Sequence, residues 1–149
     1  MANYTDSIGF NKGVAAYPAY NTDSLTKIEV TLDFATIVAA RVAAGATALA
    51  ATDTLQVLQV PANSLILAAG IEVTEAEATN TTATFSLGFV GGTTNLFAGT
   101  VASNALATTC NELAAPDFIA AADTIDLTLN TAAPTNCTIR VFAIVVDCN

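Results

Sequence analysis

Residues 53–89 read DTLQVLQVPANSLILAAGIEVTEAEATNTTATFSLGF, and this stretch decides the fold of the chain. Its apolar residues recur at every second position, first at Leu65, Leu67, Ala69, Ile71 and Val73, and then at Phe85, Leu87 and Phe89. A turn at 61–64 and a polar connection at 75–82 separate the apolar runs. This alternation predicts antiparallel strands, each with one face on a core.

Further strands are predicted on both sides of this stretch. Residues 26–34 (TKIEVTLDF) and 122–130 (ADTIDLTLN) alternate cleanly, and residues 53–60 slip in phase at Val57 and Leu58, which indicates a bulge. Residues 137–147 (CTIRVFAIVVD) are apolar on both faces from Val141 onward. We expect this last strand to be central, or to be covered by another subunit.

Two segments have no clear period. Residues 35–52 are rich in Ala, which favours helix, but Gly45 and several β-branched residues interrupt them. A short helix and an extended, tightly packed segment are both open there. In residues 93–116 we expect a short strand at Leu96-Phe97 and a helical turn within 101–113.

Seven or so antiparallel strands predict an all-β protein built as an antiparallel β-sandwich, and we favour a jelly roll within that class. We expect an extended N-terminal arm at residues 1–24 and a single sandwich domain at residues 25–149. The arm carries four large aromatic residues, Tyr4, Phe10, Tyr17 and Tyr20. Such residues anchor interfaces, so we expect the arm to lie on its own domain or on a neighbouring subunit, with a loosely packed N-terminus as the alternative.

The composition favours self-association. Hydrophobic residues make up 53% of the chain and charged residues only 11%, whereas about 25% charged is usual. A neutral, weakly apolar surface suits a subunit that is buried among neighbours, and we therefore expect a homo-oligomer.

The charge pattern argues against nucleic acid and membrane partners. Four basic residues stand against thirteen acidic ones, for a net charge of −9, and no basic cluster exists to neutralise phosphates. The longest run of low polarity, residues 34–52, contains Arg41 and is mostly Ala, so we do not expect it to span a membrane. No signal peptide is recognisable at the N-terminus.

The sequence contains no recognisable catalytic arrangement, so we expect no enzyme, no cofactor and no metal. The chain has no His and no Trp, which removes the commonest general base and the usual sugar-binding platform. Glu72, Glu75 and Glu77 cluster, but we interpret them as solvated carboxylates on an outward face and in a loop. The similar contexts of Asp53 and Asp123 predict turn residues and not a cation site.

The three cysteines leave their pairing open. Cys137 and Cys148 bracket one predicted strand, which would place them about 36 Å apart and prevent a bond between them. Cys110 is free to pair with either of them, or all three are buried thiols.

The strands and turns together resemble small virion proteins of tailed bacteriophages. The resemblance is carried by Asp53-Thr54, Val60-Pro61-Ala62, the strand 65–73, Phe85-Ser86-Leu87-Gly88, and the ending at 122–127 and 139–142. It covers residues 26–147. The family includes β-sandwich capsid decoration (cement) proteins and other head accessory proteins.

The resemblance implies a non-enzymatic structural protein on the capsid surface of a virus particle. Such a subunit binds and stabilises the capsid lattice as an oligomer, with a trimer favoured, and its partners are the major capsid protein or other virion subunits. Tyr4, Phe10, Tyr17 and Tyr20 would then insert between capsid subunits. The alternatives are a self-assembling filament or tube subunit and a glycan-binding module.

Overall fold

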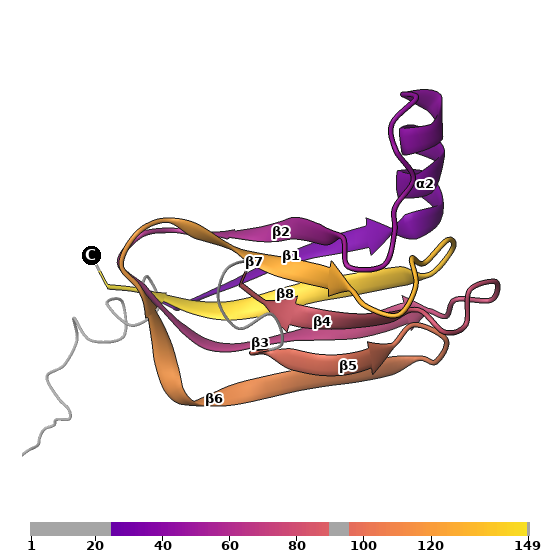
Figure 1. The fold of residues 1–149 in the computed structure, drawn as a ribbon. Helices are drawn as coiled ribbons and strands as arrows, with labels where there is room; N and C mark the ends of the chain where they lie inside the picture. The colour runs from indigo at the N-terminus through magenta and orange to yellow at the C-terminus, as the bar shows by residue number, and fades with distance from the viewer. Residues whose placement is uncertain (1–24, 90–95, 149) are drawn as a thin grey trace, which may run out of the picture.

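In the computed structural model, the described residues 25–89 and 96–148 form two four-stranded sheets that pack face to face (Figure 1). Sheet A has the strand order β1-β8-β3-β6, and sheet B has the order β2-β7-β4-β5. The elements are β1 (Leu25–Asp33), α2 (Phe34–Ala43), β2 (Thr54–Val60), β3 (Ser64–Glu75), β4 (Thr84–Gly88), β5 (Ala98–Ala102), β6 (Ala107–Ile119), β7 (Asp123–Leu129) and β8 (Thr138–Asp147). Neighbouring strands run antiparallel throughout, which confirms the predicted all-β antiparallel sandwich.

The hydrophobic core lies between the two sheets, where alternate residues of each strand point inward. Sheet A contributes Ile66, Ala69, Ile71, Val73, Ile139, Val141, Ala143 and Val145, and sheet B contributes Leu58, Val60, Phe85, Leu87, Ile125, Leu127 and Leu129. Phe34, at the start of α2, stacks on Phe85 with ring centroids 5.7 Å apart. The core therefore joins both sheets and the base of the helix.

The strands with strong alternation form where the sequence predicts them. Residues 26–34 correspond to β1, residues 122–130 to β7, and residues 137–147 to β8. β8 lies between β1 and β3, so its predicted central position is confirmed. The predicted bulge in β2 is present as a register shift between Gln56 and Leu58.

The single-sided pattern predicted for β3 is wrong at its start. The pairing of β3 with both β6 and β8 shifts between Ile66 and Ala68, and such a bulge reverses which side chains point inward. Ala69, Ile71 and Val73 are buried as expected, but Ile66 takes the inward place and Leu65 is partly exposed.

The helical turn predicted within 101–113 is also wrong. Residues 98–102 form β5 and residues 107–119 form β6, and the predicted Leu96-Phe97 strand begins instead at Ala98. β6 has little apolar contrast of its own, and its backbone pairs with β3 along most of its length. Tertiary pairing therefore sets its conformation.

Residues 34–43 form a helix, which settles the open choice for the Ala-rich segment. The Asp33 carboxylate accepts hydrogen bonds from the backbone N–H groups of Ala35 and Thr36 and so caps the first turn. Gly45 has φ +65°, a left-handed conformation that suits glycine just beyond a helix end. α2 stands away from the sandwich at one end of the molecule (Figure 1).

Candidate interaction surfaces

The projecting segment of residues 34–52, here called the α2 hairpin, is apolar in composition and largely exposed. Phe34 is its anchor and is fully buried, whereas Val42 is 72% exposed. From residue 42 to residue 48 every side chain is exposed. Helices that face solvent usually carry charges on the outer side, but the charged residue of this one is Arg41, alone among residues 34–52.

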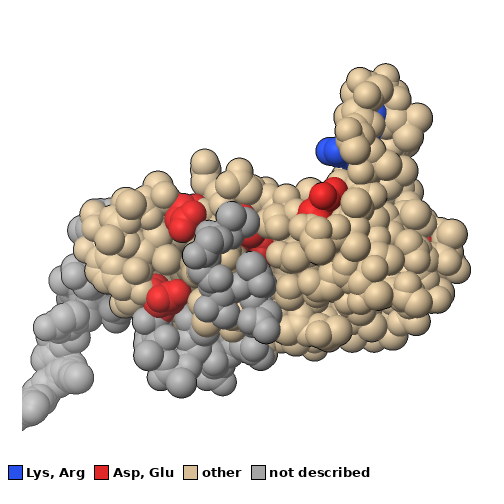
Figure 2. Space-filling model, in the orientation of Figure 1, with Lys and Arg blue, Asp and Glu red and all other residues tan. Residues whose placement is uncertain are grey.

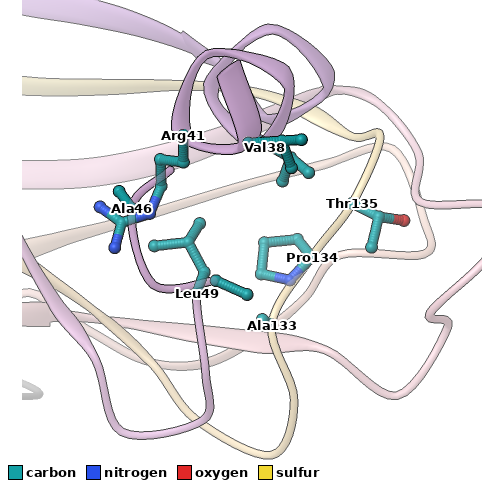
Figure 3. A pocket seen from close by; sticks show the side chains of 9 residues that line it. Val38, Arg41, Ala46, Leu49, Ala133, Pro134 and Thr135 are labelled. Atoms are coloured by element: carbon teal, nitrogen blue, oxygen red, sulfur yellow. The ribbon is translucent and has the colours of Figure 1, made fainter. Parts of the chain in front are cut away.

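A small apolar pocket lies where the α2 hairpin meets the loop between β7 and β8 (Figure 3). Its volume is about 140 Å³, and its walls include Val38, Val42, Leu49 and Pro134. Arg41 lies at its edge, where Nε and Nη2 donate hydrogen bonds to the carbonyl oxygen of Thr47. This contact ties the returning chain to the helix, so the hairpin is held as one projecting unit.

Glu77 is a carboxylate that binds Thr135, one of the residues that line the pocket. The side chain is only 2% exposed. Its Oε1 accepts hydrogen bonds from the N–H groups of Thr79 and Asn80 and from the Thr135 hydroxyl. Its Oε2 accepts from the N–H groups of Thr135 and Asn136 at 2.5 and 3.0 Å. One carboxylate thereby joins the β3–β4 loop to the β7–β8 loop.

Burial alone would raise the pKa of Glu77, but the backbone N–H groups of Asn136, Thr135, Asn80 and Thr79 lower that pKa from 4.5 to about 2. The carboxylate is therefore ionised under all ordinary conditions. Its interpretation as a solvated loop residue is wrong, because the loops that bury it lie far apart in the sequence and only folding brings them together. The Thr and Asn residues around positions 79–82 and 135–136 were the available signal, since such residues supply turn N–H groups.

The other two acidic residues of the cluster, Glu72 and Glu75, do lie at the surface, where Glu72 is partly exposed and Glu75 is exposed. Glu72 accepts a hydrogen bond from Arg140 Nη2 at 2.8 Å, and Arg140 Nη1 lies 3.6 Å from Glu29. The hydrogen bond that Arg140 donates to Glu72 is the main cause of the raised pKa of Arg140. These residues form a partly exposed ion-pair row across β3, β8 and β1, which is worth little in stability.

The two aspartates with similar contexts form local hydrogen bonds, as predicted for turn residues. Asp53 Oδ2 accepts from the N–H of Ala50, and Asp123 Oδ1 accepts from the N–H of Thr124. Their strands, β2 and β7, are neighbours in sheet B. Within residues 25–89 and 96–148, no group of three or more His, Cys, Asp or Glu side chains is placed to hold a metal ion.

All three cysteines are free thiols. Cys137 is buried, and its burial, followed by the nearby Glu77 charge, raises its pKa to about 12. Cys110 and Cys148 are exposed, so the expectation that all three thiols are buried holds for Cys137 alone.

The aromatic residues predicted to form an interface, Tyr4, Phe10, Tyr17 and Tyr20, lie outside the described residues. No helix in the described part of the chain is both long and apolar enough to cross a lipid bilayer. The face seen in Figure 2 carries few charged side chains among the described residues.

The two sheets and their register define a β-sandwich of a kind that occurs in bacteriophage capsids. The chain is similar to chains in three solved structures: the acidic stable capsid of Helicobacter pylori bacteriophage KHP30 (TM-score 0.59, 12% identity, covering 85% of this chain and 90% of that one), the capsid of Ralstonia phage GP4 (0.56, 15%, 83% and 84%), and the capsid asymmetric unit of cyanophage Pam1 (0.53, 12%, 83% and 82%). No protein-family model and no curated protein matches the sequence. The predicted resemblance to phage virion proteins is thus confirmed at the level of the fold.

Proposed function

We propose that this chain is a non-enzymatic structural protein of a bacteriophage particle, and that it decorates the capsid surface as a cement subunit. The observation that carries this proposal is the fold, which matches chains from three phage capsid structures over 82–90% of their length. Its partners are then the major capsid protein or other virion subunits, and it lies on the virion, away from membrane and nucleic acid.

The strand order supports classing the sandwich as a jelly roll, and the N-terminal arm at residues 1–24 remains a proposal from the sequence. Between β1 and β8 the chain changes sheets at six of its seven connections, and the exception is the connection from β4 to β5, which are neighbours in sheet B. The α2 hairpin is inserted in the connection from β1 to β2. Eight strands wound between two sheets in this way are the defining property of that topology.

The surface is suited to packing in a lattice. The α2 hairpin has exposed apolar side chains, and its one cation, Arg41, donates a hydrogen bond to the carbonyl oxygen of Thr47 in the same segment. We infer that the hairpin contacts a neighbouring subunit and that the arm, with Tyr4, Phe10, Tyr17 and Tyr20, supplies further anchors. A closed homo-oligomer, with a trimer favoured, would place several hairpins around one symmetry axis.

The test is cosedimentation with particles of the phage that encodes the chain, assembled without it. We expect saturable binding with a fixed ratio to capsid subunits, and a chain without residues 1–23 should not bind although it keeps its β-sheet circular dichroism. Absence of binding by the complete chain would refute the decoration role. Open-ended polymers of the purified chain in electron micrographs would support the filament alternative instead.

A further inference from the structure

The outward face of sheet A is divided into a polar half and an apolar half. The polar half contains the ion pair of Arg140 with Glu72 and the exposed Thr31 of β1, and it continues along the edge strand β1 through Glu29 and Lys27. The register of the strands places the apolar half at the opposite end of the same sheet, where β1 begins and β8 ends. Sandwich sheets normally show polar residues on their outward face, so this apolar half needs an explanation.

One row of large apolar residues crosses all four strands of sheet A. Leu25 of β1 pairs with Val146 of β8, Val146 pairs with Leu65 of β3, and Leu65 pairs with Phe118 of β6. Directly paired residues point to the same face, and the next residues along, Val145, Ile66 and Ile119, are buried in the core. The row therefore faces outward, and Leu25 and Phe118 are 53% and 54% exposed.

Two further residues of β8 extend this row into a patch. Ile144 and Phe142 lie on the same outward side as Val146 and are partly exposed. On β1 they pair with Lys27 and Glu29, whose ion pair borders the patch on that side. Phe142 pairs with Gly70, which has no side chain to cover the ring. We call Leu25, Leu65, Phe118, Phe142, Ile144 and Val146 the apolar patch. The outward face of sheet B differs, because its alternate positions are polar: Thr54, Gln56, Gln59, Thr84, Ser86, Thr124, Asp126 and Thr128.

The chain enters the fold at the patch itself, since residue 24 is joined to Leu25. The residues immediately before it, 13–24, read GVAAYPAYNTDS and contain one charge, Asp23. Tyr20 and Tyr17 lie five and eight residues from Leu25, so an extended chain carries them up to about 17 and 27 Å away. The patch spans about 14 Å across the strands and about 13 Å along them. Both rings can therefore reach any part of it without leaving the subunit.

We propose that residues 13–24 of the same chain lie across the apolar patch, with the rings of Tyr17 and Tyr20 seated on it. This divides the arm into two parts. The proximal part completes the subunit's own sheet surface, and the distal part, with Tyr4 and Phe10, remains for contact with other subunits. The assignment concerns the isolated subunit, so it stands or fails independently of capsid binding.

The chain provides its own reporter for a test. All three of its tyrosines, Tyr4, Tyr17 and Tyr20, lie in residues 1–24, and it has no Trp, so tyrosine emission reports on this segment alone. In the full-length Tyr4→Phe variant only the proximal pair emits. We expect acrylamide to quench this emission severalfold less effectively in the native protein than in urea.

The patch is then tested with two single changes in the Tyr4→Phe background, Phe118→Asp and Leu25→Asp. Each is expected to raise native quenching toward the value in urea. Leu106→Asp is the matched control, because Leu106 is 70% exposed and outside the patch, and it should leave quenching unchanged. Thermal unfolding shows which variants fold. Because two patch positions are changed separately, the test remains possible if one of the variants does not fold.

Three results would overturn the proposal. Equal quenching in native protein and in urea would leave the patch open for another occupant, such as a capsid subunit. If the tyrosines are protected from acrylamide in the native protein but neither patch variant changes their quenching, the segment lies elsewhere. Protection that is lost on dilution would assign the patch to the arm of a second copy.

Discussion

Replacing Glu77 with Gln should cost the fold about 3 kcal/mol at neutral pH. The folded pKa of Glu77 is about 2 against an ordinary 4.5, and each pKa unit corresponds to about 1.4 kcal/mol of preferential stabilisation of the charged form. Glutamine keeps the shape of the side chain but has one acceptor oxygen where the carboxylate has two. Its NH₂ group would then face either the N–H groups of Thr79 and Asn80 or those of Thr135 and Asn136.

The sign of the pH dependence follows from the direction of the shift. Because folding lowers this pKa, the contribution of Glu77 is fully present above about pH 5 and is lost as the pH falls through 4.5 toward 2. Wild-type protein should therefore lose about 3 kcal/mol more than the Glu77→Gln variant between pH 6 and pH 2. Taking the difference between the two proteins removes the effects of the other carboxylates.

The assay is urea unfolding followed by circular dichroism at pH values from 2 to 7. The matched control is Glu75→Gln, which removes an exposed carboxylate whose Oε1 accepts a hydrogen bond from the Thr138 hydroxyl; it should change stability by only about 0.5 kcal/mol. If Glu77→Gln unfolds at the wild-type urea concentration at pH 7, or both proteins show the same pH slope, the assignment of Glu77 as the link between the two loops is refuted.

Three further predictions concern packing, thiol reactivity and the α2 hairpin. Gly70→Ala should lower the free energy of unfolding by about 1–3 kcal/mol, since a Cβ there would lie 2.3 Å from the backbone oxygen of Thr109; an unchanged urea midpoint would contradict this close approach. With a pKa raised to about 12, buried Cys137 should react with a thiol reagent only after unfolding, while the two exposed cysteines react in the native protein; three rapidly labelled thiols in native protein would count against its burial. Val42→Asp should weaken capsid binding at least tenfold with little change in stability, whereas Leu106→Asp, at equal exposure, should not; equal effects would exclude a specific role for the hairpin.

Strands with strong apolar contrast could be predicted from the sequence, and strands that depend on their neighbours could not. In β1 and β7, inward aliphatic residues alternate with Thr, Asp and Lys, so the local pattern suffices. β6 contains Ala, Thr and Asn in place of such contrast. It forms because its backbone pairs with the neighbouring strand β3. The bulge at residues 66–68 of β3 has no signature in a uniformly apolar run.

The candidate surfaces were only partly visible in the sequence for a related reason. The exposure of the α2 hairpin follows from its Ala-rich, uncharged composition only once it is known to project from the sandwich. Glu77 looked solvated because its partners at 135 and 136 are 58 and 59 residues away. The apolar patch depends on register, since it is the pairing of four strands that aligns Leu25 with Phe118.

The central claim is that this sandwich is a capsid-bound subunit, and quantitative binding to capsids tests it most directly. Particles of the encoding phage, prepared without the chain, would be mixed with increasing amounts of purified protein and sedimented. The account predicts saturation at a fixed ratio of this chain to capsid subunits and a matching density on the particle surface by electron microscopy. Binding that never saturates, or no binding by folded protein, would contradict it.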